Sequence, residues 1–176
     1  PVGPSELRQK LLREHDSDFL FFAPARQNWA IKGNDRFLKA FAELRRRGIR
    51  ATLLIPGWGQ EIARSRRLCS SLGIEHQVKW LRPQSERTLV RYYQACDLVL
   101  DQFVLGVFGL TTPKAMACGA AVLTSYDKAV HDWCFTEHPP LVPCSTEKEI
   151  FDAMVRLCED RARRVAVQHE SRRWVE

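Results

Sequence analysis

The sequence predicts an α/β domain built on a doubly wound parallel sheet of about six strands. Three observations lead to this prediction. Short apolar runs alternate with segments of helical periodicity along most of the chain, which is the pattern of βαβ units. The runs are apolar at successive positions, as expected for strands that are covered on both faces. The 176 residues are also enough for one well-buried core.

Six segments have the length and composition of strands, and turn residues bound each of them. In chain order they are residues 18–25, 50–57, 76–81, 97–103, 120–125 and 140–144. The loops that follow parallel strands lie along one edge of the sheet, and ligands bind there in open α/β folds. The residues that carry function are therefore expected in these loops.

The segments between the first four strands carry helix signals. Asn34 or Asp35 can cap a helix that Gly48 ends. A second helix is predicted over residues 60–72, and a third begins at Ser85, a residue type that favours the N-cap position. Each helix would connect two strands that are consecutive in the sequence.

Two further helices are predicted towards the end of the chain. The first has Thr112 at its N-cap and Pro113 at its first helical position, and Gly119 closes it. The second begins at Thr146 and Glu149, which have the spacing of a capping box. It is predicted to run on as one long helix into an arginine-rich tail.

Clusters of arginine contribute to a net charge of +6. They lie at residues 45–47, 64–67, 161–164 and 172–173, each on a predicted helix. We interpret them chiefly as solvated helix faces, and attraction to anionic lipid or to an acidic partner stays open. No aromatic residues interleave with the arginines, so no nucleic acid partner is expected.

The cysteine pattern and the start of the chain bear on its location. Six cysteines are scattered without a C-x-x-C pair, which favours a reducing compartment and argues against a zinc site. No apolar run reaches the roughly 18 to 20 residues of a membrane span, and PVGPSEL has no leader pattern. We expect a cytoplasmic protein, with peripheral contact at the inner membrane face left open, and we expect the chain to be a fragment.

The loop after the first strand combines two cations with a glycine. Arg26 and Lys32 lie six residues apart, and Gly33 stands just before a helix. Two cations and a flexible backbone at the end of a strand suit a diphosphate group. The alternative is that both are ordinary surface cations on a connecting loop.

The loop after the fourth strand is rich in glycine. Gly106 and Gly109 bracket Val107 and Phe108 immediately before the helix predicted at Thr112. Glycine lets the backbone approach a ligand closely, and free N–H groups at the start of the helix could receive phosphate oxygens. The alternative is a tight connection in which the glycines only allow the helix to pack on the strand.

Four segments in order carry a resemblance to a known family. They are APARQNWAIKGNDRFLKAF, LLIPGWGQE, VKWLRPQSERTLVRYYQACDLVLDQF and GVFGLTTPKAMACGAAVLTS, within residues 18–127. The chain resembles the carboxy-terminal domain of the retaining, nucleotide-sugar-dependent glycosyltransferases with the GT-B fold, the glycosyl transferases group 1 family. Four motifs in the same order are far more specific than any one of them.

The resemblance implies a fold and an activity. Residues 1–176 would form a single Rossmann-like donor-binding domain, one half of a two-domain enzyme whose N-terminal Rossmann domain is missing here. The whole enzyme would transfer a sugar, with retention, from a UDP- or GDP-sugar to a sugar or lipid-linked acceptor. It would need no cofactor and no metal, and no catalytic residue is assigned in this chain.

The resemblance also implies which residues bind the donor. Arg26 and Lys32 would hold the diphosphate, the backbone from Trp80 to Pro83 would lie near the base, and Gly109 to Thr111 near the pyrophosphate. The predicted substrate-binding residues are Arg26, Lys32, Gly33, Leu81, Arg82, Asp101, Gly106, Gly109, Leu110, Thr111 and Lys114.

The sequence departs from the family at two of these positions. A pair of glutamates normally binds the sugar hydroxyls and the ribose, and Gly106 and Lys114 stand in their places. A lysine cannot accept hydrogen bonds, so Lys114 would instead pair with a phosphate, or the donor would differ. Asp101 is the nearest remaining acid and could supply an acceptor.

Other interpretations stay open. The loss of both glutamates favours a degenerate module that binds a nucleotide or a protein without catalysis. A dinucleotide-dependent oxidoreductase is disfavoured because no G-x-G-x-x-G follows the first strand. His131, Asp132, Glu137 and His138 resemble a metal cluster in composition, but they lack metal-ligand spacing and are interpreted as a surface loop.

Overall fold

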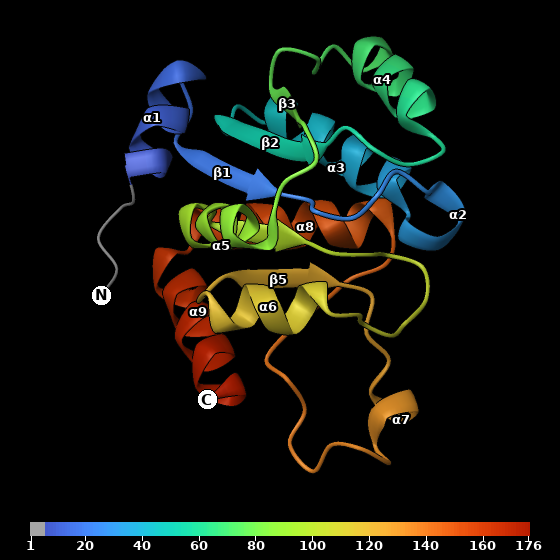
Figure 1. Cartoon of the computed structure of the whole chain (residues 1–176), viewed down its shortest axis with the longest axis vertical. Coiled ribbons are helices and arrows are strands. Elements are labelled where there is room, and N and C mark those ends of the chain that lie inside the picture. Colours follow the sequence, from blue (N-terminus) through green and yellow to red (C-terminus); the bar gives the residue numbers. More distant parts are fainter. Residues whose placement is uncertain (1–5) are drawn as a thin grey trace.

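The computed structural model describes residues 6–176 and contains one six-stranded parallel sheet (Figure 1). The strand order is β3-β2-β1-β4-β5-β6. The strands are β1 (Phe19–Phe22), β2 (Ala51–Pro56), β3 (Val78–Leu81), β4 (Leu98–Leu100), β5 (Ala121–Thr124) and β6 (Val142–Pro143). The predicted number of strands, their order along the chain and the doubly wound class are confirmed.

The order of the strands reverses direction at β1. Phe22 pairs with Leu54 of β2 on one side and with Val99 of β4 on the other. The chain first winds outwards through β2 and β3, then returns to place β4 beside β1. The loops after β1 and β4 therefore diverge at the switch point, where open α/β sheets form their binding crevice.

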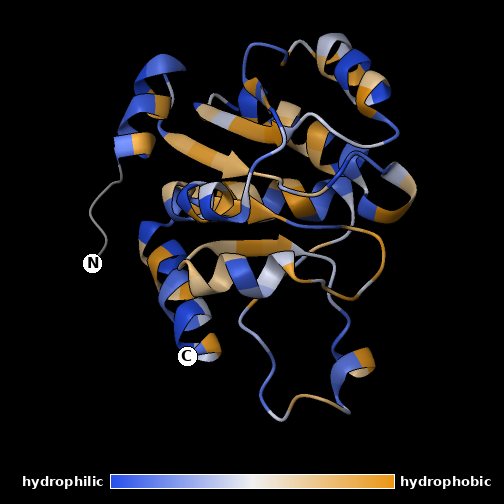
Figure 2. Ribbon diagram, in the orientation of Figure 1, coloured by the Kyte–Doolittle hydropathy of each residue, from blue (hydrophilic) through white to orange (hydrophobic). Residues whose placement is uncertain are grey.

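Helices cover both faces of the sheet (Figure 1). One face carries α3 (Asn34–Arg46), α4 (Ile62–Ser71) and α8 (Glu147–Glu159), and the other carries α1 (Glu6–Glu14), α5 (Glu86–Ala95) and α6 (Thr111–Ala117). Successive residues of β1 divide between the two cores, since Phe21 packs with α3 and Phe22 with α5. Both side chains are fully buried, and Figure 2 shows the apolar colouring along the strands.

Local capping explains where several predicted helices begin and end. Ser85 caps α5 by accepting a hydrogen bond from the Thr88 N–H, and Thr146 and Glu149 form the expected capping box of α8. Gly119 follows α6 with a φ of 75°, the left-handed conformation that favours glycine at this position. These predictions are confirmed. The predicted cap of α3 is wrong: Gly33 is its N-cap and Asn34 is its first helical residue. The buried Asn34 side chain instead accepts a hydrogen bond from the Asn28 N–H at 2.7 Å.

The start of α6 differs from the prediction. The helix begins at Thr111, with Leu110 as its N-cap, so Thr112 is not the cap and Pro113 is the third helical residue. The Thr112 side chain is buried and donates a hydrogen bond to Asp101 Oδ2 at 2.8 Å, so its hydroxyl is not available for capping. Proline is tolerated because the first N–H groups of a helix have no partner within it.

The predicted long helix near the end of the chain is divided in two. Asp160 has an extended backbone and accepts a hydrogen bond from the Arg163 N–H, so it ends α8 and caps α9 (Arg161–Val175). Val167 packs against one core, while Trp174 and Val175 pack against the other, so α9 passes from one face to the other. The short helices α1, α2 (Trp29–Lys32) and α7 (Lys128–His131) were not predicted.

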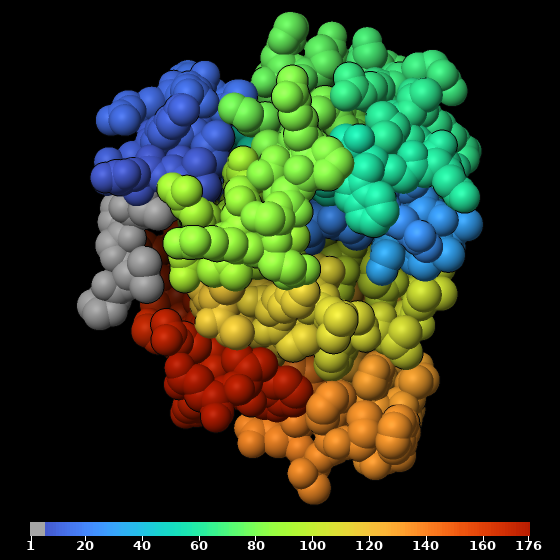
Figure 3. Space-filling model, in the orientation of Figure 1, coloured from blue at the N-terminus to red at the C-terminus, as the bar shows by residue number. Residues whose placement is uncertain are grey.

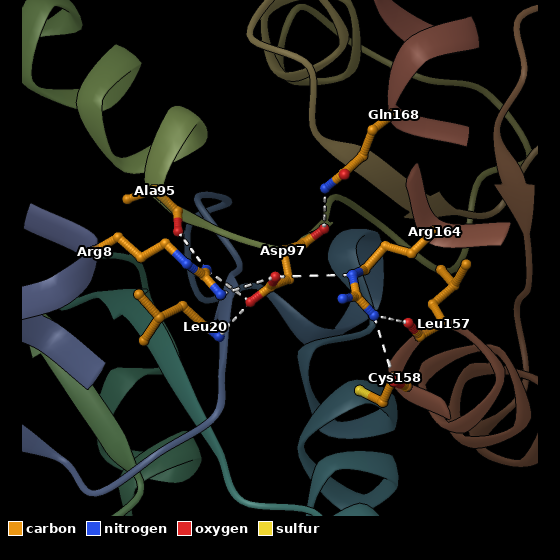
Figure 4. Close-up of polar contacts among 8 residues, drawn as sticks. All are labelled: Arg8, Leu20, Ala95, Asp97, Leu157, Cys158, Arg164 and Gln168. Atoms are coloured by element: carbon orange, nitrogen blue, oxygen red, sulfur yellow. Dashed lines mark hydrogen bonds and ion pairs between the residues drawn. The ribbon is translucent and has the colours of Figure 1, made fainter. Parts of the chain in front are cut away.

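The amino edge of the sheet is held by a buried charge cluster around Asp97 (Figure 4). Arg8 of α1 donates to both carboxylate oxygens, at 2.8 and 3.1 Å, and the Leu20 N–H of β1 donates at 2.9 Å. Arg164 Nε of α9 lies 3.8 Å from the same carboxylate, and Gln168 donates to the Asp97 carbonyl. The cluster joins α1, β1, β4 and α9 at the edge opposite the candidate site.

Within residues 6–176, no helix is both long and apolar enough to cross a bilayer.

Candidate functional site at the carboxyl edge

The loop after β1 is packed tightly onto the loop after β4. Gly33 ends α2 with a φ of 63°, and a Cβ atom there would lie 3.2 Å from Phe103 Cβ and from Val104 Cγ2. The Lys32 carbonyl accepts a hydrogen bond from the Phe103 N–H at 3.1 Å. Gly33 is therefore required both by its backbone conformation and by the close approach of the two loops.

Two cations of this loop have uncommitted side chains. Arg26 is exposed and Lys32 is half-buried. Neither side chain makes an ion pair or a hydrogen bond with any of residues 6–176. Both follow the carboxyl end of β1 at the switch point, so their charge is available to an anion bound at this edge of the sheet.

The Asp101 carboxylate lies beneath α6 rather than on the surface. Asp101 is 1% exposed and accepts the Thr112 hydrogen bond. Burial raises the pKa of Asp101, while the Thr112 hydrogen bond and the charge of Lys32 act in the opposite direction. In this arrangement Asp101 positions the first turn of α6, and its predicted role as a ligand acceptor stays a prediction.

Helices α5 and α6 are in contact beside this edge of the sheet. Tyr93 of α5 is buried, which raises the pKa of its phenol, and Asp101 and Glu86 act in the same direction, against a hydrogen bond with Thr111. Lys114 is the fourth residue of α6, and its Nζ lies 2.9 Å from Glu86 Oε2 of α5. The lysine is thus ion-paired with the neighbouring helix.

The loop after β4 is held from below by Gln102, a residue that the sequence did not single out. Its fully buried side chain accepts hydrogen bonds from the N–H groups of Val104 and Leu105. It donates to the carbonyl oxygens of Val107 and Ser125. One amide therefore fixes four backbone points, and no local pattern in the sequence indicates this.

Gly106 lies at the top of this loop, against the segment after β5. It has a φ of 65°, and its N–H donates to Ser125 Oγ at 3.2 Å. The Asp127 N–H donates to the Gly106 carbonyl at 2.8 Å, and a Cβ atom at position 106 would lie 3.3 Å from Asp127 Cβ. The Asp127 side chain thus stands directly beside Gly106.

A cleft of about 680 Å³ opens at this point, beyond the ends of β4, β5 and β6. Gly106, Ser125 and Asp127 line it together with Lys128 and Arg36. Of the residues predicted to bind substrate, Gly106 is the one that lines this cleft. The others lie along the same edge, towards β1 and α5.

The remaining predicted residues differ in how the fold uses them. Gly109 is exposed and has open space where a Cβ atom would stand, and Leu110 is 76% exposed. Leu81 ends β3 with its side chain buried, and Arg82 is exposed just before α5. The fold alone does not require a glycine at 109 or an exposed leucine at 110.

The histidines of the 126–138 segment are engaged with protein partners. His138 lies 2.6 Å from the Tyr126 hydroxyl and 2.9 Å from Asp132 Oδ1, while His131 Nδ1 lies 2.7 Å from the Asp127 carbonyl. Within the part of the chain that the structure describes, no three His, Cys, Asp or Glu side chains meet to form a metal site.

Comparison with known sequences gives one family and several relatives. Residues 5–174 match the glycosyl transferases group 1 family. A D-inositol 3-phosphate glycosyltransferase from Mycolicibacterium smegmatis is 36% identical over 98 residues, which cover 54% of this chain and 22% of that protein. The enzyme of the same name from Frankia alni is 29% identical over 134 residues, 71% of this chain and 32% of that protein.

Comparison with solved structures agrees on the fold. The Anabaena HepE protein, in a complex with UDP and glucose, superposes with a TM-score of 0.78 at 21% identity, over 99% of this chain and 47% of that one. The C-terminal domain of LpcC, a glycosyl transferase group 1 family protein from Francisella tularensis, gives a TM-score of 0.70 at 19% identity over 98% and 92%. The chain therefore spans about half of HepE and nearly all of an isolated C-terminal domain.

Proposed function

Because this chain belongs to the glycosyl transferases group 1 family, we propose that it is the donor-binding domain of a glycosyltransferase. The complete enzyme transfers a sugar, with retention, from a nucleotide diphosphate sugar to an acceptor. The observation that carries the proposal is the pair Arg26 and Lys32 at the switch point of the sheet, two cations whose side chains form no ion pair or hydrogen bond within residues 6–176.

The chemistry of the reaction asks for cations at this place. Negative charge builds on the departing nucleotide diphosphate as the bond to the sugar breaks. Positive charges fixed near that group stabilise the transition state more than the ground state. Arg26 and Lys32 would fill this role by themselves, so we expect donor binding without a metal ion.

Further residues along the edge complete the proposed donor site. Leu110 caps α6 without a side-chain hydrogen bond, so the first turn can offer backbone N–H groups near Gly109 to Thr111 to phosphate oxygens. Leu81 and Arg82, at the end of β3, would lie beside the base. HepE, which shares this fold, is solved with UDP and glucose, and we favour a UDP-sugar over a GDP-sugar for this chain.

The proposed enzyme needs a second half. The chain covers 47% of HepE, which leaves room in such a protein for an N-terminal Rossmann domain. That domain would supply the contacts to a sugar or lipid-linked acceptor and the catalytic group, and we assign no catalytic residue here. The arginine clusters on α4 and α9 would favour peripheral contact with anionic lipid at the inner face of the membrane.

A non-catalytic module is the second candidate. It is favoured by Gly106 and Lys114, which remove both carboxylates that the family resemblance implies at these positions. Such a module would bind a nucleotide, or only a protein partner, without sugar transfer.

Calorimetric titration of the domain with UDP, GDP, UDP-glucose and GDP-mannose tests the proposal, in the presence of EDTA. We expect a nucleoside diphosphate to bind at a single site without added metal. Absence of binding by all four compounds would overturn the donor-binding function and leave the protein-interaction module. Binding that requires Mg²⁺ would overturn the metal-free part alone.

A further inference from the structure

We propose that two carboxylates from neighbouring elements, Glu86 of α5 and Asp127 after β5, accept hydrogen bonds from the hydroxyl groups of the nucleotide sugar. The inference rests on the proposed donor-binding function. It assigns Glu86 to the ribose and Asp127 to the transferred sugar. Neither residue is among the substrate-binding residues predicted from the sequence.

Glu86 forms an ion pair between α5 and α6 that uses only one of its two carboxylate oxygens. Its Oε2 pairs with Lys114 Nζ at 2.9 Å, and its side chain is 70% exposed. The other carboxylate oxygen, Oε1, accepts no hydrogen bond from residues 6–176. An ionised carboxylate only accepts hydrogen bonds, so this oxygen is suited to a hydroxyl donor.

The place of Glu86 along the edge fits a ribose. It follows Leu81 and Arg82, proposed to lie near the base, by a few residues, and Lys114 ties it to the helix whose start is proposed to meet the diphosphate. The ribose of a nucleotide lies between these two groups. Either of its two neighbouring hydroxyls can donate a hydrogen bond to the free Oε1.

Asp127 lies on the other side of the loop after β4, beside Gly106. Its Oδ1 accepts a hydrogen bond from the Ala129 N–H, while Oδ2 accepts none from the described residues. The side chain is exposed and lines the 680 Å³ cleft beside Gly106 and Ser125. That volume lies within the range of small-molecule sites, and the polar lining suits a ligand with several hydroxyls.

The order of groups in the ligand matches the order in the protein. The 106–111 segment, with the start of α6, lies between α5 and the segment that contains α7 (Figure 3). A nucleotide sugar places its diphosphate between the ribose and the transferred sugar. With the diphosphate at this segment, the two sets of hydroxyls meet Glu86 on one side and Asp127 on the other.

Each carboxylate also has a cation beside it. Lys114 pairs with Glu86, and Lys128 follows Asp127 in the lining of the cleft, where Arg36 also lies. A bare carboxylate near a diphosphate would repel it, and a neighbouring cation reduces that repulsion. The role of Lys114 is therefore to offset the charge of Glu86, which a lysine paired with a phosphate would not do.

The ribose arm is tested by calorimetry with a nucleoside diphosphate and its 2′,3′-dideoxy analogue, using UDP or GDP, whichever the wild type binds more tightly. We expect Glu86→Gln to weaken binding of the natural nucleotide about tenfold and to leave the dideoxy analogue unchanged. Glu159→Gln is the matched control, because Glu159 pairs with Arg47 at 2.7 Å at the far end of α8. Equal affinity of wild type and Glu86→Gln for the natural nucleotide would overturn this arm.

The sugar arm compares the same nucleoside diphosphate with its sugar, UDP-glucose or GDP-mannose. Asn can still cap α7, so Asp127→Asn should keep the fold. We expect this variant to weaken nucleotide-sugar binding about tenfold and to leave the free nucleotide unchanged. Asp152→Asn, whose exposed carboxylate pairs with Lys148, is the control.

The outcomes distinguish a failure of this inference from a failure of the proposed function. Wild-type protein that binds no nucleotide would overturn the proposed function, and this inference with it. Wild-type protein that binds, while Asp127→Asn or Glu86→Gln keeps wild-type affinity for every ligand, would overturn the inference and leave the proposed function standing.

Discussion

Arg8 and Asp97 form a two-point ion pair, at 2.8 and 3.1 Å, that joins the first helix of the structure to the amino end of a central strand. The Asp97 side chain is 10% exposed, and Arg8 is 21% exposed. The Asp97 carboxylate also accepts a hydrogen bond from the Leu20 N–H and lies near Arg164. Its removal would therefore leave several donors without an acceptor.

The first prediction follows from this pair. Asp97→Ala should lower the free energy of unfolding by roughly 3 kcal/mol, because charged groups would remain partly buried without their partner. Chemical denaturation measures this. Asp152→Ala removes the exposed partner of Lys148 and should cost less than about 1 kcal/mol. Equal losses in the two variants would show that the Asp97 cluster does not brace the amino edge.

The second prediction concerns the cations of the loop after β1. Arg26→Ala and Lys32→Ala should each weaken nucleoside diphosphate binding by roughly 1.5 to 3 kcal/mol, the range for hydrogen bonds to charged groups. The fold should be kept, since neither side chain forms an ion pair or a hydrogen bond within residues 6–176. Arg67→Ala, at an exposed position on α4, is the matched control for calorimetry. Unchanged affinity in both variants would identify them as ordinary surface cations.

The third prediction concerns the Lys114–Glu86 pair. Lys114→Glu places two carboxylates together, so it should lower stability, by less than about 1 kcal/mol for an exposed pair. An unpaired lysine in the first turn would oppose the helix dipole, and its replacement by glutamate would raise stability. Lys114 is the fourth residue of α6 and is ion-paired, so we expect a loss of stability instead. The exchange Lys114→Glu with Glu86→Lys should restore both the melting temperature and ribose-dependent binding. A double variant no better than Lys114→Glu alone would contradict this.

The fourth prediction concerns pH. The folded-state pKa of Asp101 is raised above 3.8, so the folded protein binds its proton more tightly than the unfolded chain does. Asp101 therefore favours folding below pH 3.8, and this contribution is lost as pH rises through the raised pKa. Asp101→Asn can still accept the Thr112 hydrogen bond, so its melting temperature relative to wild type should increase from pH 4 to pH 7. A difference independent of pH would contradict the role of burial.

The fifth prediction concerns thiol reactivity. Burial raises the pKa of Cys69 to about 11 and of Cys144 and Cys158 to about 12, so these thiols should react slowly. Cys134 is exposed and should be alkylated first. Peptide mass spectrometry after brief iodoacetamide treatment checks this. Labelling of Cys144 as fast as Cys134 would show that the core opens readily.

The strands and most caps could be predicted because their causes are local. Phe21 and Phe22 stand in an apolar run, and Thr146 and Glu149 are three residues apart. The start of α6 could not, because the Thr112 hydroxyl binds Asp101, eleven residues earlier, and this contact depends on how the helix packs on β4.

The residues of the candidate site likewise divide into those with a local cause and those whose contacts depend on packing. Arg26 and Lys32 can be found from their loop, since the end of a strand determines where they lie. The Lys114–Glu86 pair spans 28 residues and exists only because α5 and α6 lie side by side. The position of Asp127 beside Gly106 depends likewise on how two loops meet.

The support that Gln102 gives to the loop after β4 bears on how such a domain can diversify. The backbone over residues 104–107 is held by one amide below it, while Leu105 and Val107 point outwards and are exposed. Substitutions at these outer positions can alter what the loop touches without altering its course. Ligand preference can therefore change in evolution while the course of the loop is preserved.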